Sequence, residues 1–209
     1  MSYSLLIDTS DKYLTVGVSS NDEVIYSTSF EAWQRQSEFL VVEIKKALAS
    51  IDIDLKDIDT IVCGLGPGSY TGVRIALTFA KVLASTTNVK IKTVSSLAIL
   101  GNTDISFIGL INARSNRSYI AIYDKGRAVL EDTIKPNDEV LKLIEEYKAL
   151  GYEIKGDLGY LKLESSKLDL VKGLLSFSKI REEETDVLSL KPVYLKEALW
   201  LLDLVKKKI

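Results

Sequence analysis

The chain has 209 residues, of which 46% are hydrophobic, so it can bury the core of one large domain or of two small ones. Its 27 Lys and Arg residues face 29 Asp and Glu residues, and the net charge of −2 excludes a global basic field that would hold nucleic acid. The absence of histidine excludes Ser/His/Asp and Cys/His triads and His-x-x-x-His metal pairs. A single cysteine, Cys63, excludes an internal disulfide.

These counts also bear on location. The N-terminal stretch MSYSLLIDTS lacks the charged region, the long apolar region and the cleavage site of a signal peptide. The longest weakly charged stretch, 73–85, contains Arg74 and Lys81 and is too short to span a membrane. We therefore expect a cytoplasmic protein with no membrane segment.

The first hundred residues alternate between strand and helix patterns. Runs rich in β-branched residues predict strands, and apolar residues at three- and four-residue spacing predict helices, the first of them with Ser37 as its N-cap. The expected order is three strands, a helix, a strand, a helix, a strand and a short helical piece, at 3–8, 12–20, 23–30, 37–51, 60–66, 70–86, 89–94 and 95–101.

A similar order returns after the polar turn that begins at Gly101. The patterns predict three strands, a helix and a strand at 105–111, 118–124, 128–134, 138–150 and 152–157, with an ambiguous segment at 158–177 and a terminal helix at 197–208. The sequence therefore predicts an α/β fold of two similar subdomains, 1–101 and 102–209, the second of them degenerate.

A glycine-rich turn joins the strand at 60–66 to the second predicted helix. Its glycines lack the lysine of a Walker loop and the spacing of a dinucleotide fingerprint. Two interpretations remain: a tight turn that seats the helix, which we favour, or an anion site at the helix N-terminus. The candidate residues are Gly66, Pro67, Gly68, Ser69, Thr71, Gly72 and Arg74.

The two predicted helices carry more apolar residues than one buried face needs. The second helix is apolar on nearly every side, which indicates either burial on all sides or contact with a partner. We slightly favour a protein interface over cover by the second half of the chain. The candidate interface residues are Leu40, Ile44, Leu48, Val73, Ala76, Leu77, Phe79, Ala80 and Leu83.

Four segments together resemble one known family. LLIDTSDKYLTVGV, GLGPGSYTGVRIALTFAKVLA, LINARSNRSYIAIYD and KPVYLKEALW follow one another as the signatures of the TsaB (YeaZ) family do. The resemblance implies an actin-like, ASKHA-type fold of two RNase-H-like halves. It also implies a noncatalytic subunit that binds and activates the catalytic subunit TsaD, which makes threonylcarbamoyladenosine in tRNA next to the anticodon.

The same resemblance implies several partners. The two helices would contact TsaD or form a homodimer in isolation, the ATPase TsaE would dock on the complex, and tRNA would be reached only through the complex. The histidine pair of the catalytic relative falls near Ser96 and Leu100, and Gln36 stands where a histidine is common. No cofactor and no metal are expected.

The resemblance further implies a vestigial cleft, for which the candidate residues are Asp8, Thr9, Asn112 and Arg114. The first hairpin keeps the Asp and Thr but lacks the glycine that lets a backbone approach phosphate. An independent ASKHA-class kinase, with Asp8 holding Mg²⁺, is the alternative, and a peptidase is disfavoured because no activated nucleophile or metal pair is evident.

Overall fold

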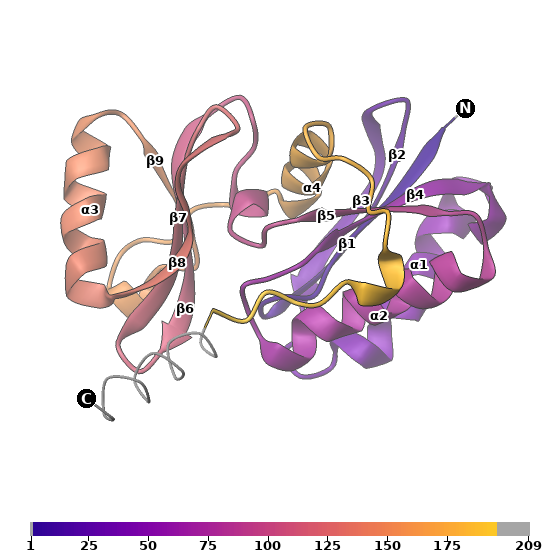
Figure 1. Ribbon diagram of the computed structural model, residues 1–209, viewed down its shortest axis with the longest axis horizontal. Coiled ribbons are helices and arrows are strands. Elements are labelled where there is room, and N and C mark those ends of the chain that lie inside the picture. Colours follow the sequence, from indigo (N-terminus) through magenta and orange to yellow (C-terminus); the bar gives the residue numbers. More distant parts are fainter. Residues whose placement is uncertain (1, 196–209) are drawn as a thin grey trace.

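The computed structural model describes residues 2–195 and consists of two β-sheets flanked and separated by helices (Figure 1). The first sheet has the strand order β3-β2-β1-β4-β5, with β1, β2 and β3 antiparallel and β4 and β5 parallel to β1. Its strands are Tyr3–Asp8, Tyr13–Ser20, Glu23–Glu31, Ile58–Gly64 and Lys90–Val94, in order from β1 to β5. The expected order of strands and helices in this half is confirmed.

The second sheet repeats this arrangement on a smaller scale. Its order is β8-β7-β6-β9, which matches β3-β2-β1-β4 of the first sheet strand for strand. Its strands are Ser106–Arg114, Arg117–Asp124, Arg127–Pro136 and Glu153–Gly156, from β6 to β9, and α3 (Asn137–Ala149) precedes the last of them. The predicted duplication with a reduced second half is confirmed within residues 2–195.

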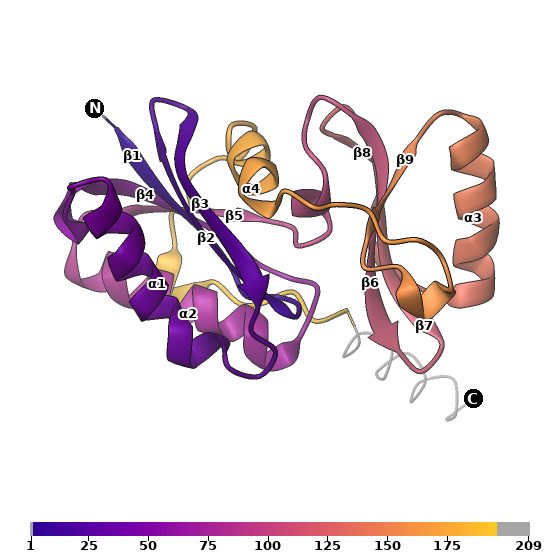
Figure 2. The ribbon, with the colours of Figure 1, turned by 180° about the vertical axis from the view of Figure 1, so that it is seen from behind.

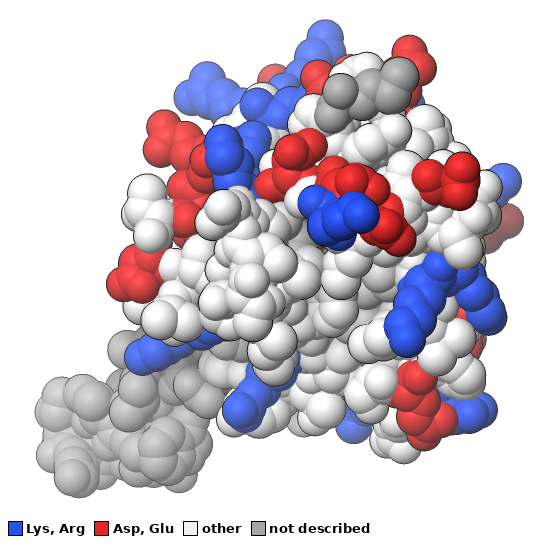
Figure 3. Space-filling view, turned by 90° about the vertical axis from the view of Figure 1, so that its right-hand side faces the viewer, with Lys and Arg blue, Asp and Glu red and all other residues white. Residues whose placement is uncertain are grey.

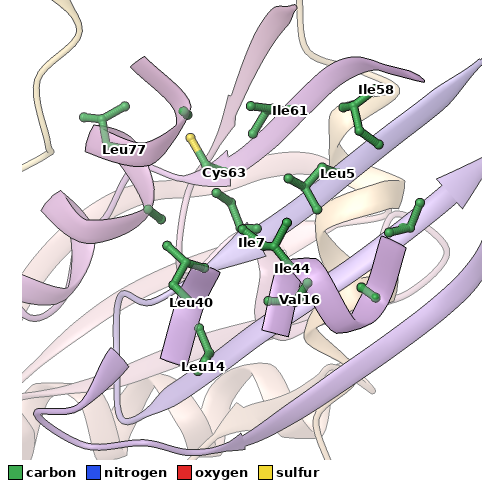
Figure 4. Packing of buried hydrophobic residues seen from close by; sticks show 14 of the residues in the cluster. Leu5, Ile7, Leu14, Val16, Leu40, Ile44, Ile58, Ile61, Cys63 and Leu77 are labelled. Atoms are coloured by element: carbon green, nitrogen blue, oxygen red, sulfur yellow. The ribbon is translucent and has the colours of Figure 1, made fainter. Parts of the chain in front are cut away.

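Two helices cover one face of the first sheet, and successive side chains along its strands point alternately toward and away from that face. Leu5 and Ile7 of β1 and Ile61 of β4 point toward α1 (Gln36–Ser50) and α2 (Tyr70–Thr86), and all three side chains are fully buried (Figure 4). Leu6 lies in β1 between two of these residues and belongs to the opposite core. The central strands β1 and β4 are thus buried on both faces, as parallel strands usually are, whereas the edge strand β3 is largely exposed.

The opposite core lies between the two sheets and contains α4 (Leu170–Ser178), as both ribbon views show (Figures 1 and 2). This helix packs on the first sheet, where a Cβ on Gly17 would lie 2.4 Å from a methyl group of Val171. The ambiguous segment therefore contains a buried helix that comes from the second half of the chain but covers the first sheet. The division at residue 101 stays a prediction as a domain boundary.

The start of α1 differs from the prediction. Ser37 is not the N-cap of α1: the helix begins at Gln36, and Arg35 occupies the cap position without a side-chain hydrogen bond. The side-chain amide of Gln36 donates to the Asp11 carbonyl at 2.9 Å. The predicted helix at 197–208 lies outside the described residues. Within residues 2–195, every helix is too short or too polar to cross a membrane.

Candidate functional site

A cleft of about 640 Å³ lies where the glycine turn, the start of α1 and the end of β6 meet. Of the predicted turn and cleft residues, the structure brings six into its lining, which are Gly68, Ser69, Thr71, Gly72, Asn112 and Arg114. Asp8, Thr9, Gly66, Pro67 and Arg74 do not line it, although all five lie in the described part of the chain. The cleft therefore joins both halves of the molecule but not all of the expected residues.

Aromatic side chains that the sequence reasoning missed also line this cleft. Trp33, Tyr70, Tyr119 and Tyr194 come from four separate segments, so no local spacing could have predicted that they meet. The Arg114 guanidinium lies 5.7 Å from the centre of the Trp33 ring, which is within the range of a cation–π contact. This contact crosses from the second half of the chain to the first.

The glycine turn is seated on the loop between β1 and β2. The Ser69 amide donates to the Ser10 carbonyl at 2.6 Å, and the Ser69 hydroxyl accepts from the Gly72 amide at 3.2 Å as the N-cap of α2. A Cβ at Gly68 or Gly72 would lie 2.3 Å or 2.1 Å from a backbone carbonyl oxygen of that loop. The glycines thus permit close backbone contact within the protein, which favours the tight-turn interpretation over a phosphate loop.

Asp8 is enclosed rather than presented to the cleft. It is 2% exposed, and its Oδ2 accepts from the amide and the hydroxyl of Ser10 at 3.2 and 2.9 Å. Its Oδ1 has no hydrogen-bond partner among residues 2–195 and faces Gly64. Burial raises the pKa of Asp8 to about 6, an effect that the hydrogen bonds from Ser10 oppose.

Other groups that could do chemistry are also withdrawn from solvent. Cys63 is buried in β4, and burial, together with the nearby charge of Asp8, raises the pKa of its thiol to about 12, which excludes a reactive thiolate at neutral pH. In the described part of the chain, Cys, Asp and Glu side chains do not gather in groups of three that could hold a metal ion.

The predicted interface residues require a correction at the level of side chains. Seven of the nine are at most 6% exposed: Leu40, Ile44, Leu48, Val73, Ala76, Leu77 and Ala80. All of these except Val73 lie in the core between the first sheet and its two helices. The sequence of α2 does not show which of its many apolar residues face the sheet. Helical spacing tells which residues share a side of the helix, but not which side is packed against the rest of the chain. Only Phe79 and Leu83 remain half-buried.

The apolar surface on α1 and α2 therefore keeps Phe79 of the predicted residues and is otherwise formed by residues outside that set. Val41 and Val42 of α1 and Val82 of α2 are 47%, 46% and 59% exposed. Ile75 and Phe79 are half-buried and precede Val82 in α2 by seven and three residues, which places them on the same side of that helix. We call these five residues the docking face. Figure 3 shows a wide uncharged area on one side of the molecule, with charged side chains mainly around it. Whether a partner binds at the docking face stays a prediction.

The chain itself covers another flank of α2. The Lys81 ammonium donates to the carbonyls of Leu188 and Leu190 at 2.6 and 3.1 Å, and the rings of Tyr70 and Tyr194 stack with their centres 4.8 Å apart. The second half of the chain thus covers part of α2, namely the side that carries Lys81 and Tyr70. The docking face is left on the rest of the helix.

Two sheets with matching strand order and a cleft between the halves define an actin-like, ASKHA-type fold. A solved structure described as YeaZ from Pseudomonas aeruginosa superposes with a TM-score of 0.79 at 25% identity, over 93% of this chain and 100% of that chain. The family model described as TsaD, tRNA N6-adenosine threonylcarbamoyltransferase, matches residues 30–177. The chain therefore belongs to this family, and its relatives place it with the TsaB (YeaZ) members.

The curated relatives are similar over part of their length. A Bacillus subtilis protein named tRNA threonylcarbamoyladenosine biosynthesis protein TsaB is 34% identical over 141 residues, which is 66% of this chain and 61% of that protein. A protein of the same name from Buchnera aphidicola subsp. Schizaphis graminum is 29% identical over 70% of this chain and 77% of that protein. The family resemblance inferred from the four motifs is confirmed.

The glycine turn yields the first prediction. Replacing a helical glycine by alanine ordinarily stabilises a helix by about 1 kcal/mol, but in Gly72→Ala the new methyl would meet the Thr9 carbonyl oxygen. We expect the free energy of unfolding to fall by about 2 kcal/mol, as in an overpacked core. Urea denaturation of Gly72→Ala and of Gly159→Ala, whose Cβ would meet only a carboxylate oxygen at 3.9 Å, measures the difference. Equal stabilities would contradict the close packing.

The burial of Asp8 yields a prediction about pH. Because its pKa is about 6 in the folded state and about 4 when unfolded, the folded protein binds this proton more tightly, and stability falls as pH rises from about 4 to about 6. Asp8→Asn should remove this loss and raise the free energy of unfolding at pH 7.5 by about 1 to 3 kcal/mol. Thermal unfolding from pH 4 to pH 8 measures the effect.

The control for this experiment is Asp132→Asn. Burial also raises the pKa of Asp132 to about 6, so this residue contributes in the same pH window and must be separated from Asp8. The Asp132→Asn variant should retain the Asp8 contribution to the pH dependence. An Asp8→Asn variant that is less stable than the wild type at pH 7.5 would show that the Asp8 carboxylate stabilises the fold as an anion.

Proposed function

We propose that this chain is a noncatalytic docking subunit that binds and activates a TsaD-type catalytic subunit for the synthesis of threonylcarbamoyladenosine in tRNA, next to the anticodon. The observation that carries the proposal is the docking face, an apolar surface on two helices of a chain that belongs to this family. The valines of this surface are 46–59% exposed. Exposed apolar side chains are unfavourable in water, and burying them under a partner would lower the free energy of the complex.

The state of the chemical groups supports a noncatalytic role. Ser96 and Leu100 stand near the positions of the catalytic relative's histidine pair, and both are at most 8% exposed. The Ser96 hydroxyl accepts from the Gly66 amide at 3.1 Å, and Leu100 packs in the core between the sheets. The side chains at these positions serve packing, and neither carries an imidazole. Activation would then act through the shape of the partner rather than through groups supplied by this chain.

The remaining partners belong to the same proposal. A TsaE-type ATPase would dock on the complex of the two subunits, and tRNA would be bound only by that complex, consistent with the net charge of −2. In the absence of the catalytic subunit the docking face would pair with a second copy of itself. A cytoplasmic location follows from a role in tRNA modification.

The cleft of about 640 Å³ keeps one alternative open, a stand-alone ASKHA-class kinase, because this volume would accommodate a nucleotide. Titration of the purified chain with Mg-ATP separates the two functions. A kinase must bind Mg-ATP with useful affinity when alone, whereas the docking subunit should show little or no binding, because Asp8 is enclosed and the turn of the first hairpin, residues 9–12, lacks a glycine. Micromolar affinity would favour the kinase.

A substitution within the docking face tests the main proposal. Val82→Glu places a charge on a side chain that is 59% exposed, so the isolated chain should stay folded, with stability within about 0.5 kcal/mol of the wild type. In the complex that charge would be buried without a partner, a loss of several kcal/mol. We expect the variant to lose association with the TsaD homologue of the same organism in light scattering, and to lose tRNA modification in a reconstituted reaction.

The matched control is Val129→Glu on β8, where the valine is 49% exposed and lies outside the docking face. It should associate and support modification like the wild type. Ala76→Glu is unsuitable as a test, because Ala76 is fully buried and the charge would disrupt the core. Normal assembly by Val82→Glu would show that the docking face is not the contact.

A further inference from the structure

The loop between β1 and β2, residues 9–12, contacts three other parts of the chain. The Ser10 carbonyl accepts from the backbone amide of Ser69 at the start of α2, and the Asp11 carbonyl accepts from the side-chain amide of Gln36 at the start of α1. Lys12 forms an ion pair with Asp157 in the second half of the molecule. One short loop therefore fixes where both helices of the docking face begin.

Thr9 makes the most unusual of these contacts. Its hydroxyl donates to the Gly72 carbonyl at 2.6 Å and accepts from the Ala76 amide at 3.2 Å. In an uninterrupted α-helix the amide of residue 76 donates directly to the carbonyl of residue 72. The Thr9 hydroxyl thus bonds to both groups of one helical hydrogen-bond pair, and it is supplied by a different segment of the chain.

A hydroxyl that bonds to both groups of such a pair ties this turn of the helix to the loop that carries the hydroxyl. Thr9 is fully buried, so solvent is not placed to take over the role of its hydroxyl. The absence of a side chain at Gly72 lets the loop approach this closely, since a Cβ there would lie 2.1 Å from the Thr9 carbonyl oxygen. The first turn of α2 is therefore anchored to the loop through Thr9.

We propose that Thr9 is a positioning residue for the docking face, and that its hydroxyl sets the direction of the first turn of α2. Ile75 and Phe79 of the docking face lie on either side of Ala76, to which the hydroxyl is bonded. The same loop also contacts the start of α1, because the Asp11 carbonyl accepts from the side-chain amide of Gln36. This inference rests on the proposed function, because it concerns the surface that the partner would cover.

Three variants separate positioning from ordinary stabilisation. Thr9→Val removes the hydroxyl at nearly constant shape, and Thr9→Ser keeps the hydroxyl but removes the methyl. Thr15→Val is the matched control: Thr15 is also fully buried, and its hydroxyl forms a hydrogen bond of 2.9 Å with the Ser29 hydroxyl, away from α2. Thr9→Ala, which adds no methyl, replaces Thr9→Val if the latter does not fold.

Two measurements apply to each variant. Affinity for the TsaD homologue is measured by titration calorimetry, and the ¹³Cα chemical shifts and amide exchange of residues 69–77 are measured by NMR on the chain alone. We expect Thr9→Val to bind about tenfold more weakly, because only a fraction of molecules would present the competent geometry, and to change the shifts. Thr9→Ser should bind and resonate like the wild type, and Thr15→Val should bind normally even if its melting temperature falls.

Several results would overturn the inference. These are wild-type affinity of Thr9→Val, an equal loss in Thr15→Val, or unchanged shifts at residues 69–77 when the Thr9 hydroxyl is absent. Failure of the wild-type chain to bind the TsaD homologue would instead refute the proposed function. In that case the shifts alone decide: a change in Thr9→Val that Thr9→Ser restores supports positioning, and no change refutes it.

Discussion

The contact on which the rest of the structure depends is the close approach of the glycine turn to the loop between β1 and β2. The Ser69 amide and the Ser10 carbonyl are 2.6 Å apart, and a Cβ on Gly72 would overlap the Thr9 carbonyl oxygen. Only glycine permits this distance, and the distance seats α2 on the sheet. Because α2 supplies most of the docking face, the glycine turn would support partner binding without touching a partner.

The duplicated architecture places a second constraint on the chain. The first sheet is buried on both faces, by α1 and α2 on one side and by α4 on the other. Since α4 follows the second sheet in sequence, the first half lacks a complete core without residues 170–178. A single helix between the sheets thus ties the halves together, and the Lys12–Asp157 ion pair and the Arg114–Trp33 contact add to this connection.

The spacing of apolar residues along the chain predicted most of the helices and strands. It did not predict which distant segments of the chain meet. The bounds of α2 follow from Ser69 as its N-cap and from the apolar run, both of which are local. The segment around α4 remained ambiguous, because α4 has nine residues, too few for a helical period to stand out in the sequence. In α2, apolar residues on nearly every side hid which of them lie in the core, and Ala76 was therefore expected at the interface. The aromatic lining of the cleft was missed because its members are dispersed along the chain.

The enclosure of Asp8 and the role of Thr9 share one cause. In the cleft that the resemblance implies, this pair would face a bound phosphate and its Mg²⁺. Here the Ser10 hydroxyl donates to one oxygen of Asp8. The Thr9 hydroxyl bonds to the Gly72 carbonyl and the Ala76 amide of α2. Both side chains therefore face protein instead of ligand. A loop that has become part of the packing under the docking helices would then affect function through the surface of those helices, and substitutions in it would alter association before they altered any chemistry.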